Sequence, residues 1–523
     1  MDGKNNLFPF WSKGKDFVMD TIIQTKYGLL QGKREENMVS FLGIPYAKAP
    51  VGELRWHEPV ELNPWEGVRE ALELGSPSLQ HNGQAIPGGD PAERGVFNND
   101  SEDCLYLNVW SPAVTSDDRL PVFVWIHGGA FCCGSGGGKS ASPEPFCSRG
   151  IVYVTFNYRL GLMGYFVHPE LAKESEHNVS GNYAHFDQLM ALKWVKENIV
   201  SFGGDPNNIT VGGCSAGCGS TQVLCNSPLA KGLFQKAILE STVALAGAMY
   251  PEDFKLSEMK EMEDRGVEFM ELLGCNSIEE MRSMTFEELT APEESKFRRK
   301  FHYGTTIGTC ADGYLLPKHY SWGNVMHKNA DIPYIAGNTH DENGGFVFFK
   351  DIEGFRQRNL PVFGKYTDEY LTLCNTESLD KIKESMRNSH LLLARSKVFA
   401  ERNAEIGRKP VWVFDFCRKN SANGEAHHGL ETQYLLGTFT SLPGVTEKDG
   451  KLAKIMQEYW CNFIHNGDPN GEGLLHWSPY TKENRKVLYL DCPEVTVGDD
   501  AVCEHPLLTY TRKRLEEKLE NNY

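Results

Sequence analysis

The stretch VGGCSAGCGS, residues 211–220, decides how the rest of the chain is interpreted. The residues before it turn from polar to apolar, as a strand entering a core does, and the residues after it, TQVLC, favour a helix. The pattern Gly-x-Ser-x-Gly therefore lies at a turn from strand to helix. Such a turn holds its serine in a strained backbone conformation, with the hydroxyl exposed above the sheet. Ser215 is the candidate nucleophile, and two thiols, Cys214 and Cys218, lie beside it.

Short apolar runs rich in β-branched and aromatic residues recur on both sides of this turn and predict buried strands. They are PVFVWI (121–126), IVYVTF (151–156), NITVGG (208–213), KAILES (236–241), PYIAGNT (333–339) and PVWVFDF (410–416). Residues 185–202 repeat apolar side chains at helical spacing, which predicts an amphipathic helix between the second and third of these strands. This alternation predicts an α/β fold with a mostly parallel sheet covered by helices on both faces.

No Pro/Gly/Ser-rich linker or internal repeat divides the chain. We therefore expect residues 21–523 to form a single domain, with residues 1–20 as an N-terminal extension. Charged helical patterns at about 250–330 and 350–408 predict helical additions to the sheet rather than separate domains. The apolar segment NLFPFW in the extension is a candidate docking arm, and the Gly/Pro-rich loop at 85–95 is a candidate border of the active site.

Composition narrows the classes of function. The chain has 523 residues and a net charge of −17 without a dense basic run, so nucleic acid is not an expected partner. The start of the chain lacks the apolar core of a signal peptide, and no apolar run is long enough for a membrane span. The 14 cysteines are scattered, which favours reduced thiols and a cytoplasmic location. No clustered Cys/His pattern predicts a zinc site, so we expect no metal.

A serine needs a base to take its proton, and the base needs an acid to orient it. At a turn of this kind the acid and then the base follow the serine along the chain. Two Gly-rich loops offer them: GNTHDENGG (337–345) just after a predicted strand, and AHHGLE (426–431). Spacing alone leaves two acids and two bases open: Asp341 or Glu342, and His427 or His428. The segment WIHGGAF (125–131) supplies small residues whose backbone N–H groups can face an oxyanion, each such donor being worth about 3 kcal/mol.

Taken together, these segments resemble the type-B carboxylesterases, the family that includes the cholinesterases, and within it the bacterial-type carboxylesterases. The resemblance covers nearly the whole chain from about residue 21, in family order. It rests on FLGIPYAKAPVGELRW (41–56), SEDCLYLNVW (101–110), VWIHGGAF (124–131), NYRLGLMGYF (157–166), residues 181–210, GCSAG (213–217), GNTHDENGG, AHHGLE and WCNFIHNGDPN (460–470). It implies an α/β-hydrolase fold, with a mostly parallel sheet flanked by helices and helical insertions that form a cap or regulatory region.

The resemblance also implies a role for each site residue. It makes Ser215 the nucleophile, Glu342 the acid and His428 the base. It further implies an oxyanion hole formed by the backbone N–H groups of Gly129, Ala130 and Ala216, with that of Gly128 as an alternative. It also implies that the side chain of Ser241 supports the acid. The expected function is a serine carboxylesterase that hydrolyses small-molecule esters through an acyl-serine, without a cofactor. The alternatives are hydrolysis of a related acyl bond (amide, thioester, carbamate or lactone) and a non-catalytic recognition protein of the same fold.

The chain departs from the family pattern near the nucleophile. Most members have Glu where Cys214 stands, Gly where Cys218 stands and an aromatic residue at position 212, which is Gly here. Cys214 is an alternative nucleophile only if the register of the turn shifts by one residue, which breaks the Gly-x-Nuc-x-Gly pattern. Loss of the adjacent carboxylate removes negative charge that favours cationic substrates.

Two further features bear on the substrate. Cys104 has no cysteine upstream, so the disulfide loop of cholinesterases cannot form, and residues 79–103 contain no Trp that would stack on a cation. Both features argue against choline esters. Cys132 and Cys133 follow the oxyanion segment, and we consider both pocket lining and ordinary packing for them. His127 is expected to shape the oxyanion loop rather than to act as a base.

Overall fold

The computed structural model describes residues 19–80, 99–241, 256–291, 308–320, 328–342, 351–354, 356–357, 368–369, 372, 390–419 and 424–500. The segment NLFPFW, the loop at 85–95 and residues 343–345 lie outside the described residues. Most of residues 350–389, the first part of the second predicted helical addition, also lies outside the described residues.

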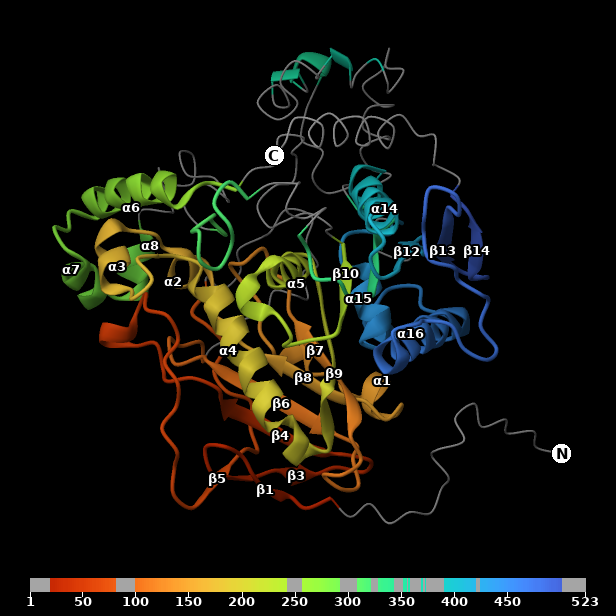
Figure 1. The fold of residues 1–523 in the computed structure, drawn as a ribbon, viewed down its shortest axis with the longest axis horizontal. Helices are drawn as coiled ribbons and strands as arrows, with labels where there is room; N and C mark the ends of the chain where they lie inside the picture. Colours follow the sequence, from red (N-terminus) through yellow and green to blue (C-terminus); the bar gives the residue numbers. More distant parts are fainter. Residues whose placement is uncertain are drawn as a thin grey trace.

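One large sheet organises the described part of the chain (Figure 1). It has 11 strands in the order β14-β13-β12-β11-β10-β9-β7-β8-β6-β4-β3. The pairs from β8 through β7, β9, β10, β11 and β12 to β13 are parallel, and the outer pairs are antiparallel. The predicted α/β fold with a mostly parallel sheet is therefore confirmed. The strands are β3 Lys33–Arg34, β4 Val39–Pro45, β6 Tyr106–Ser111, β7 Leu120–Ile126, β8 Val152–Phe156, β9 Gly204–Cys214, β10 Lys236–Glu240, β11 Tyr334–Thr339, β12 Val411–Phe416, β13 Lys486–Leu490 and β14 Thr496–Asp499.

A second, smaller sheet lies at the N-terminal end of the described chain. It joins β1 (Ile22–Gln24), β2 (Leu29–Gln31) and β5 (Val68–Glu70) in that order. All six strands predicted from sequence are present in the large sheet, with bounds that differ by a few residues. The largest difference is β9, which starts four residues before the predicted run and reaches Cys214, next to the candidate nucleophile.

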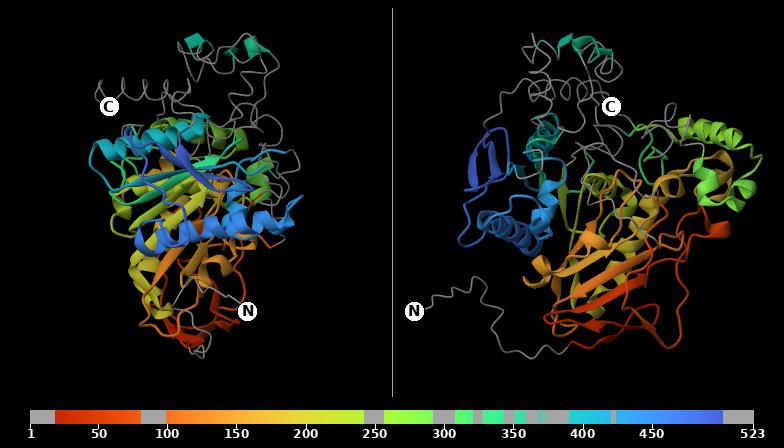
Figure 2. Two further views of the ribbon diagram at one scale, coloured as in Figure 1. Left: turned by 90° about the vertical axis from the view of Figure 1, so that its right-hand side faces the viewer. Right: turned by 180° about the vertical axis from the view of Figure 1, so that it is seen from behind.

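Helices cover the sheet, and a further group of helices lies at one side of the molecule (Figures 1 and 2). The predicted helix at 185–202 is confirmed as α4 (Tyr183–Asn198), which continues into a 3₁₀ turn at Ile199–Phe202. Helices α6, α7 and α8 lie beside α3, on the opposite side of the molecule from β13 and β14. No helix in the described part of the chain is long and apolar enough to cross a membrane. The other helices named here are α1 Glu144–Cys147, α2 Gly161–Tyr165, α3 Pro169–Glu174, α5 Ala216–Asn226, α6 Met259–Leu273, α7 Ile278–Ser283, α8 Phe286–Thr290, α14 His390–Glu405, α15 Leu430–Leu435 and α16 Glu447–Asn466.

The strands feed two separate cores because successive side chains point to opposite faces of a sheet. In β7, Val122 and Val124 join the core that includes α4, α5 and α14, whereas Phe123 and Trp125 join the core that includes α1, α15 and α16. In β12, odd-numbered residues follow the first face and even-numbered residues the second. Both faces are therefore buried, and functional side chains concentrate at the carboxyl ends of the parallel strands.

Candidate active site

The turn that carries Ser215 is sharp and strained. Strand β9 ends at Cys214 and α5 begins at Ala216, which leaves Ser215 at φ 59° and ψ −124°. The turn requires glycine on its inner side: a Cβ on Gly217 would lie 2.0 Å from the carbonyl oxygen of Ile126. A Cβ on Gly213 would lie 2.5 Å from the same oxygen and 2.6 Å from the carbonyl carbon of Gly217. The two glycines let strand and helix approach, and this approach fixes the direction of the serine.

Three side chains from separate segments meet at this turn. The Oγ of Ser215 lies 2.7 Å from Nε2 of His428, and the other ring nitrogen, Nδ1, contacts Oε1 of Glu342. The Glu342 side chain is 1% exposed and that of His428 is 14% exposed. The carboxyl is thus shielded from water, while the imidazole and the serine are partly exposed. This order of contacts can transfer a proton from the serine to the imidazole, with the carboxylate stabilising the resulting imidazolium.

The Glu342 carboxylate is held by donors on its second oxygen. Oε2 accepts hydrogen bonds from the backbone N–H of Thr339 at 3.0 Å, from the hydroxyl of Thr339 and from the hydroxyl of Ser241 at 3.1 Å. Ser241 follows directly on β10, and Thr339 ends β11. Two neighbouring strands therefore orient the acid, and Ser241 makes the contact that the resemblance implied.

Asp341 and His427, the two alternatives left open by spacing, lie elsewhere. Asp341 accepts the backbone N–H of Ala426 at 2.9 Å, and its own N–H donates to the Ala426 carbonyl at 3.1 Å. It also pairs with Lys419 at 3.1 Å. Nδ1 of His427 lies 3.0 Å from the carbonyl oxygen of His428. Asp341 thus fastens the segment that carries His428 to the segment that carries Glu342.

A buried acid that sequence reasoning missed lies behind the serine and histidine. Glu431 lies three residues after His428 in the sequence. Its Oε1 contacts the Ser241 hydroxyl and lies 3.7 Å from Sγ of Cys214. Burial, together with the charge of Glu342, raises the pKa of Glu431 to about 7. The Ser241 hydroxyl has one proton between two carboxyl groups, so a protonated Glu431 can donate to Ser241 while Ser241 donates to Glu342. The only sequence signal for Glu431 was its position at the end of the segment AHHGLE, close to the candidate base.

A second buried acid adjoins the first. Glu240, the last residue of β10, accepts the indole N–H of Trp460 at 2.7 Å. Burial, and then the neighbouring Glu431, raises the pKa of Glu240 well above its ordinary value. Both acids are held toward the neutral form, since two unpaired charges would be costly in this interior. The region behind Ser215 therefore carries less negative charge than its acidic residues suggest.

The predicted oxyanion segment lies against Ser215. A Cβ on Gly128 would lie 3.3 Å from the Cβ of Ser215, so backbone and serine are adjacent. Gly129 and Ala130 have φ values of 110° and 51°, and Ala216 is the first residue of α5. Among the described residues, the backbone N–H groups of Gly129, Ala130 and Ala216 have no hydrogen-bond partner. Such donors are suited to an incoming carbonyl oxygen.

His127 packs inside the loop as expected. Its ring stacks on Tyr158 with centroids 4.4 Å apart, and its Nδ1 lies 2.8 Å from the carbonyl oxygen of Gly128. Burial lowers the pKa of His127 to about 4. The ring is neutral and supports the loop from behind.

The neighbouring cysteines are packed against backbone or core. The thiols of Cys132 and Cys133 lie 3.5 Å and 3.4 Å from the carbonyl oxygen of Gly129. Pocket lining by these two residues stays a prediction. Cys218 is fully buried in α5, and Cys214 points into the second core, away from the Ser215 hydroxyl. Cys104 is buried and forms no disulfide with a described residue.

Comparison with known proteins identifies the family of the chain. The model of the carboxylesterase family matches residues 19–504. The chain belongs to the carboxylesterase family. This carboxylesterase is 33% identical to the para-nitrobenzyl esterase of Bacillus subtilis (strain 168), over 92% of this chain and 97% of that protein. It is 32% identical to the fumonisin B1 esterase of Sphingopyxis macrogoltabida, over 89% of this chain and 85% of that protein.

Solved structures agree with the family. A PNB esterase superposes on this carboxylesterase with a TM-score of 0.77 and 30% identity, covering 95% of this chain and 99% of that one. The fold is thus the α/β-hydrolase fold, and the resemblance seen in the sequence is confirmed. The protein is a carboxylic ester hydrolase that acts on small-molecule esters.

Proposed function

We propose that Ser215, His428 and Glu342 form the catalytic triad of this carboxylesterase and that hydrolysis passes through an acyl-serine. The observation that carries the proposal is the 2.7 Å contact between Ser215 Oγ and His428 Nε2 at a strained strand-to-helix turn. His428 takes the hydroxyl proton as Oγ attacks the ester carbonyl. It then gives the proton to the leaving alcohol. A water molecule activated by the same imidazole releases the acid and restores the serine.

The oxyanion would be held by backbone donors rather than by a cation. We assign the N–H groups of Gly129, Ala130 and Ala216 to this role, with that of Gly128 as the alternative. Their support is the position of the loop against Ser215 and the start of α5 directly after it. Donors fixed by the fold need no reorganisation as the charge develops, which lowers the barrier by about 3 kcal/mol for each donor.

The substrates we propose are neutral esters. Cys214 places no carboxylate next to Ser215, and burial holds Glu431 and Glu240 toward their neutral forms. Little negative charge is therefore available to attract a cationic alcohol group. The Ser–His–Glu geometry also favours a hydrolase over the non-catalytic recognition protein, and related acyl bonds remain open to the same chemistry.

We also propose a cytoplasmic location without a nucleic acid or membrane partner. A buried thiol at Cys104, without a disulfide to a described residue, fits a reducing compartment. The acidic net charge of −17 supports the exclusion of nucleic acid.

The experiment compares wild type, Ser215→Ala and Cys214→Ala on a series of short p-nitrophenyl esters. We expect Ser215→Ala to lower kcat on the order of 10⁶-fold and Cys214→Ala to retain most of the activity. Mass spectrometry of the wild type after reaction with a fluorophosphonate should locate the label on the peptide at Ser215. A label on Cys214, or hydrolysis that survives in Ser215→Ala, would overturn the assignment.

A further inference from the structure

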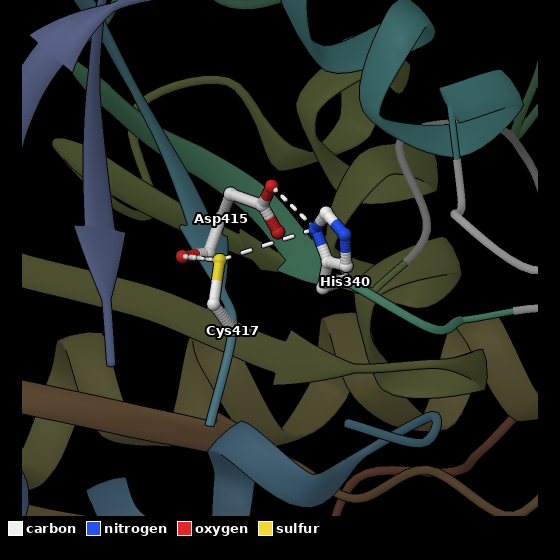
Figure 3. Close-up of side chains that lie close together, drawn as sticks. All are labelled: His340, Asp415 and Cys417. Carbon is white, nitrogen blue, oxygen red and sulfur yellow. Dashed lines mark hydrogen bonds and ion pairs between the residues drawn. The ribbon is translucent and has the colours of Figure 1, made fainter. Parts of the chain in front are cut away.

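Three side chains of types that can ligate a metal, none of them in the proposed triad, lie close together (Figure 3). Strands β11 and β12 are parallel neighbours, with Asn338 opposite Asp415 and Thr339 opposite Phe416. The backbone N–H of His340 continues the pairing by donating to the carbonyl of Phe416 at 2.8 Å. Because side chains alternate along a strand, Asp415 and Cys417 lie on one face. The register places His340 beside them.

The distances between the ligand atoms are short enough for one ion. Nδ1 of His340 lies 3.0 Å from Oδ2 of Asp415 and 3.9 Å from Sγ of Cys417. All three ligand atoms lie within 4.8 Å of one another. The usual zinc bond lengths in a tetrahedral shell separate nitrogen from oxygen by about 3.3 Å and nitrogen from sulfur by about 3.6 Å. Shifts of a few tenths of an ångström would bring these pairs to the tetrahedral separations.

The carboxyl of Asp415 provides an independent sign of a missing partner. Asp415 is 2% exposed, and its Oδ1 is buried without a hydrogen-bond partner among the described residues. A buried carboxylate oxygen without a partner is costly, so such atoms call for an explanation such as an ion. His340 and Cys417 are only partly buried, which leaves a route for a cation and for water.

We propose that His340, Asp415 and Cys417 bind one divalent cation of the zinc type, with water completing a tetrahedral shell. The nitrogen, oxygen and sulfur donors favour a borderline-soft ion over magnesium or calcium, which prefer oxygen ligands. A thiolate and a carboxylate together neutralise the charge of the ion. The ion plays no part in acyl transfer by Ser215.

The cation would fasten the ends of two strands close to the proposed acid. His340 precedes Glu342 by two residues, and Asp341 between them already contacts Ala426. Binding that is confined to the folded chain raises its stability by mass action. Added zinc should therefore raise the melting temperature of the ion-depleted protein.

The test uses the full-length chain after chelator treatment and dialysis, titrated with Zn²⁺ alone by calorimetry. Two variants, Cys417→Ser and His340→Gln, each remove one ligand. Cys275→Ser is the matched control, since Cys275 is also a partly exposed thiol, and it contacts Met284 far from this site. Co²⁺ is a second probe, because a thiolate ligand gives a charge-transfer band in the near ultraviolet.

We expect wild type and Cys275→Ser to bind one Zn²⁺ per chain and to show the Co²⁺ band. Each ligand variant should bind Zn²⁺ at least about tenfold more weakly, the lower bound seen on removing even an outer-shell partner of a metal site. Cys417→Ser should also lose the band. If Cys417→Ser does not fold, His340→Gln provides the test. The His340 side chain is 30% exposed, so its substitution should leave the fold intact. A wild type that binds no ion, or ligand variants that bind as wild type does, would overturn the proposal.

Discussion

The thiol of Cys214 lies 3.7 Å from the carboxyl of Glu431, although 217 residues separate them in the chain. Cys214 precedes the candidate nucleophile and Glu431 follows the candidate base. Both side chains point into the core on the far side of the turn, behind Ser215 and His428. Because position 214 carries a thiol, Glu431 supplies the one carboxyl group of this pair, and burial holds that carboxyl toward its neutral form.

Replacing Glu431 by Gln should change how stability depends on pH. The pKa of Glu431 is raised by burial from 4.5 to about 7, so the unfolded chain releases this proton first as the pH rises. The stability that the protonated group contributes is complete below about pH 4.5 and is lost as the pH rises to about 7. Thermal unfolding measured from pH 4.5 to 8 should show a smaller loss in Glu431→Gln than in wild type. Glu70→Gln, on an exposed strand, is the control, and parallel curves for all three proteins would contradict the role of Glu431.

The hydroxyls of Ser241 and Thr339 should matter more for turnover than for binding. Each donates to Oε2 of Glu342, and a hydrogen bond to a charged group contributes about 1.5–3 kcal/mol. We expect Ser241→Ala and Thr339→Val each to lower kcat roughly 10- to 100-fold while KM changes little. Steady-state kinetics with one p-nitrophenyl ester provide the measurement. An equal rise in KM with unchanged kcat would place these hydroxyls outside the orientation of the acid.

The neighbouring acids Asp341 and Glu342 should differ sharply in effect. Glu342 contacts the imidazole, so Glu342→Gln should lower kcat on the order of 10⁴-fold, as loss of the orienting carboxylate does in serine proteases. Asp341 contacts backbone, and Asp341→Asn keeps an acceptor for the N–H of Ala426. The expected loss for Asp341→Asn is therefore small, and Asp341→Ala should cost about 1–3 kcal/mol of stability instead. A larger kinetic loss in Asp341→Asn than in Glu342→Gln would reverse the assignment.

The close approach at the turn should not tolerate a side chain. A Cβ at position 217 would lie 2.0 Å from the carbonyl oxygen of Ile126, so Gly217→Ala must displace strand β7 or helix α5. We expect a loss of about 3 kcal/mol or more in unfolding free energy, together with loss of hydrolysis. Gly450→Ala in α16 is the control, since nothing lies within 4 Å of its Cβ position, and it should be neutral or stabilising by about 0.5–1 kcal/mol. Denaturant titration compares the two, and equal stabilities would contradict the packing argument.

Several elements were readable directly from the chain. The apolar runs at 121–126 and 410–416 predicted buried strands, and the structure shows two cores that share each strand. The helix at 185–202 was predicted by its spacing, although its last turn tightens to a 3₁₀ form. These features follow from local periodicity, which a single sequence displays.

The segments of the candidate site could also be predicted from the sequence, but spacing alone did not identify the residues within each segment. Spacing could not separate Asp341 from Glu342, or His427 from His428, because each pair offers the same functional group at adjacent positions, and the direction of a side chain is not visible in a sequence. The resemblance to the family chose Glu342 and His428. The structure directs those two side chains toward each other and directs Asp341 to backbone.

The sequence by itself determined the strand and helix pattern, the glycine turn at Ser215 and the order of the segments that follow it, because each depends on neighbours along the chain. Tertiary structure alone decided which distant side chains meet. Cys214 reaches Glu431, and His340 reaches Asp415 across 75 residues, because the register of parallel strands brings their ends together. No local spacing encodes that register, since parallel strands are joined by crossover connections of a dozen or more residues. The convergence of His340, Asp415 and Cys417 was for this reason invisible in the sequence.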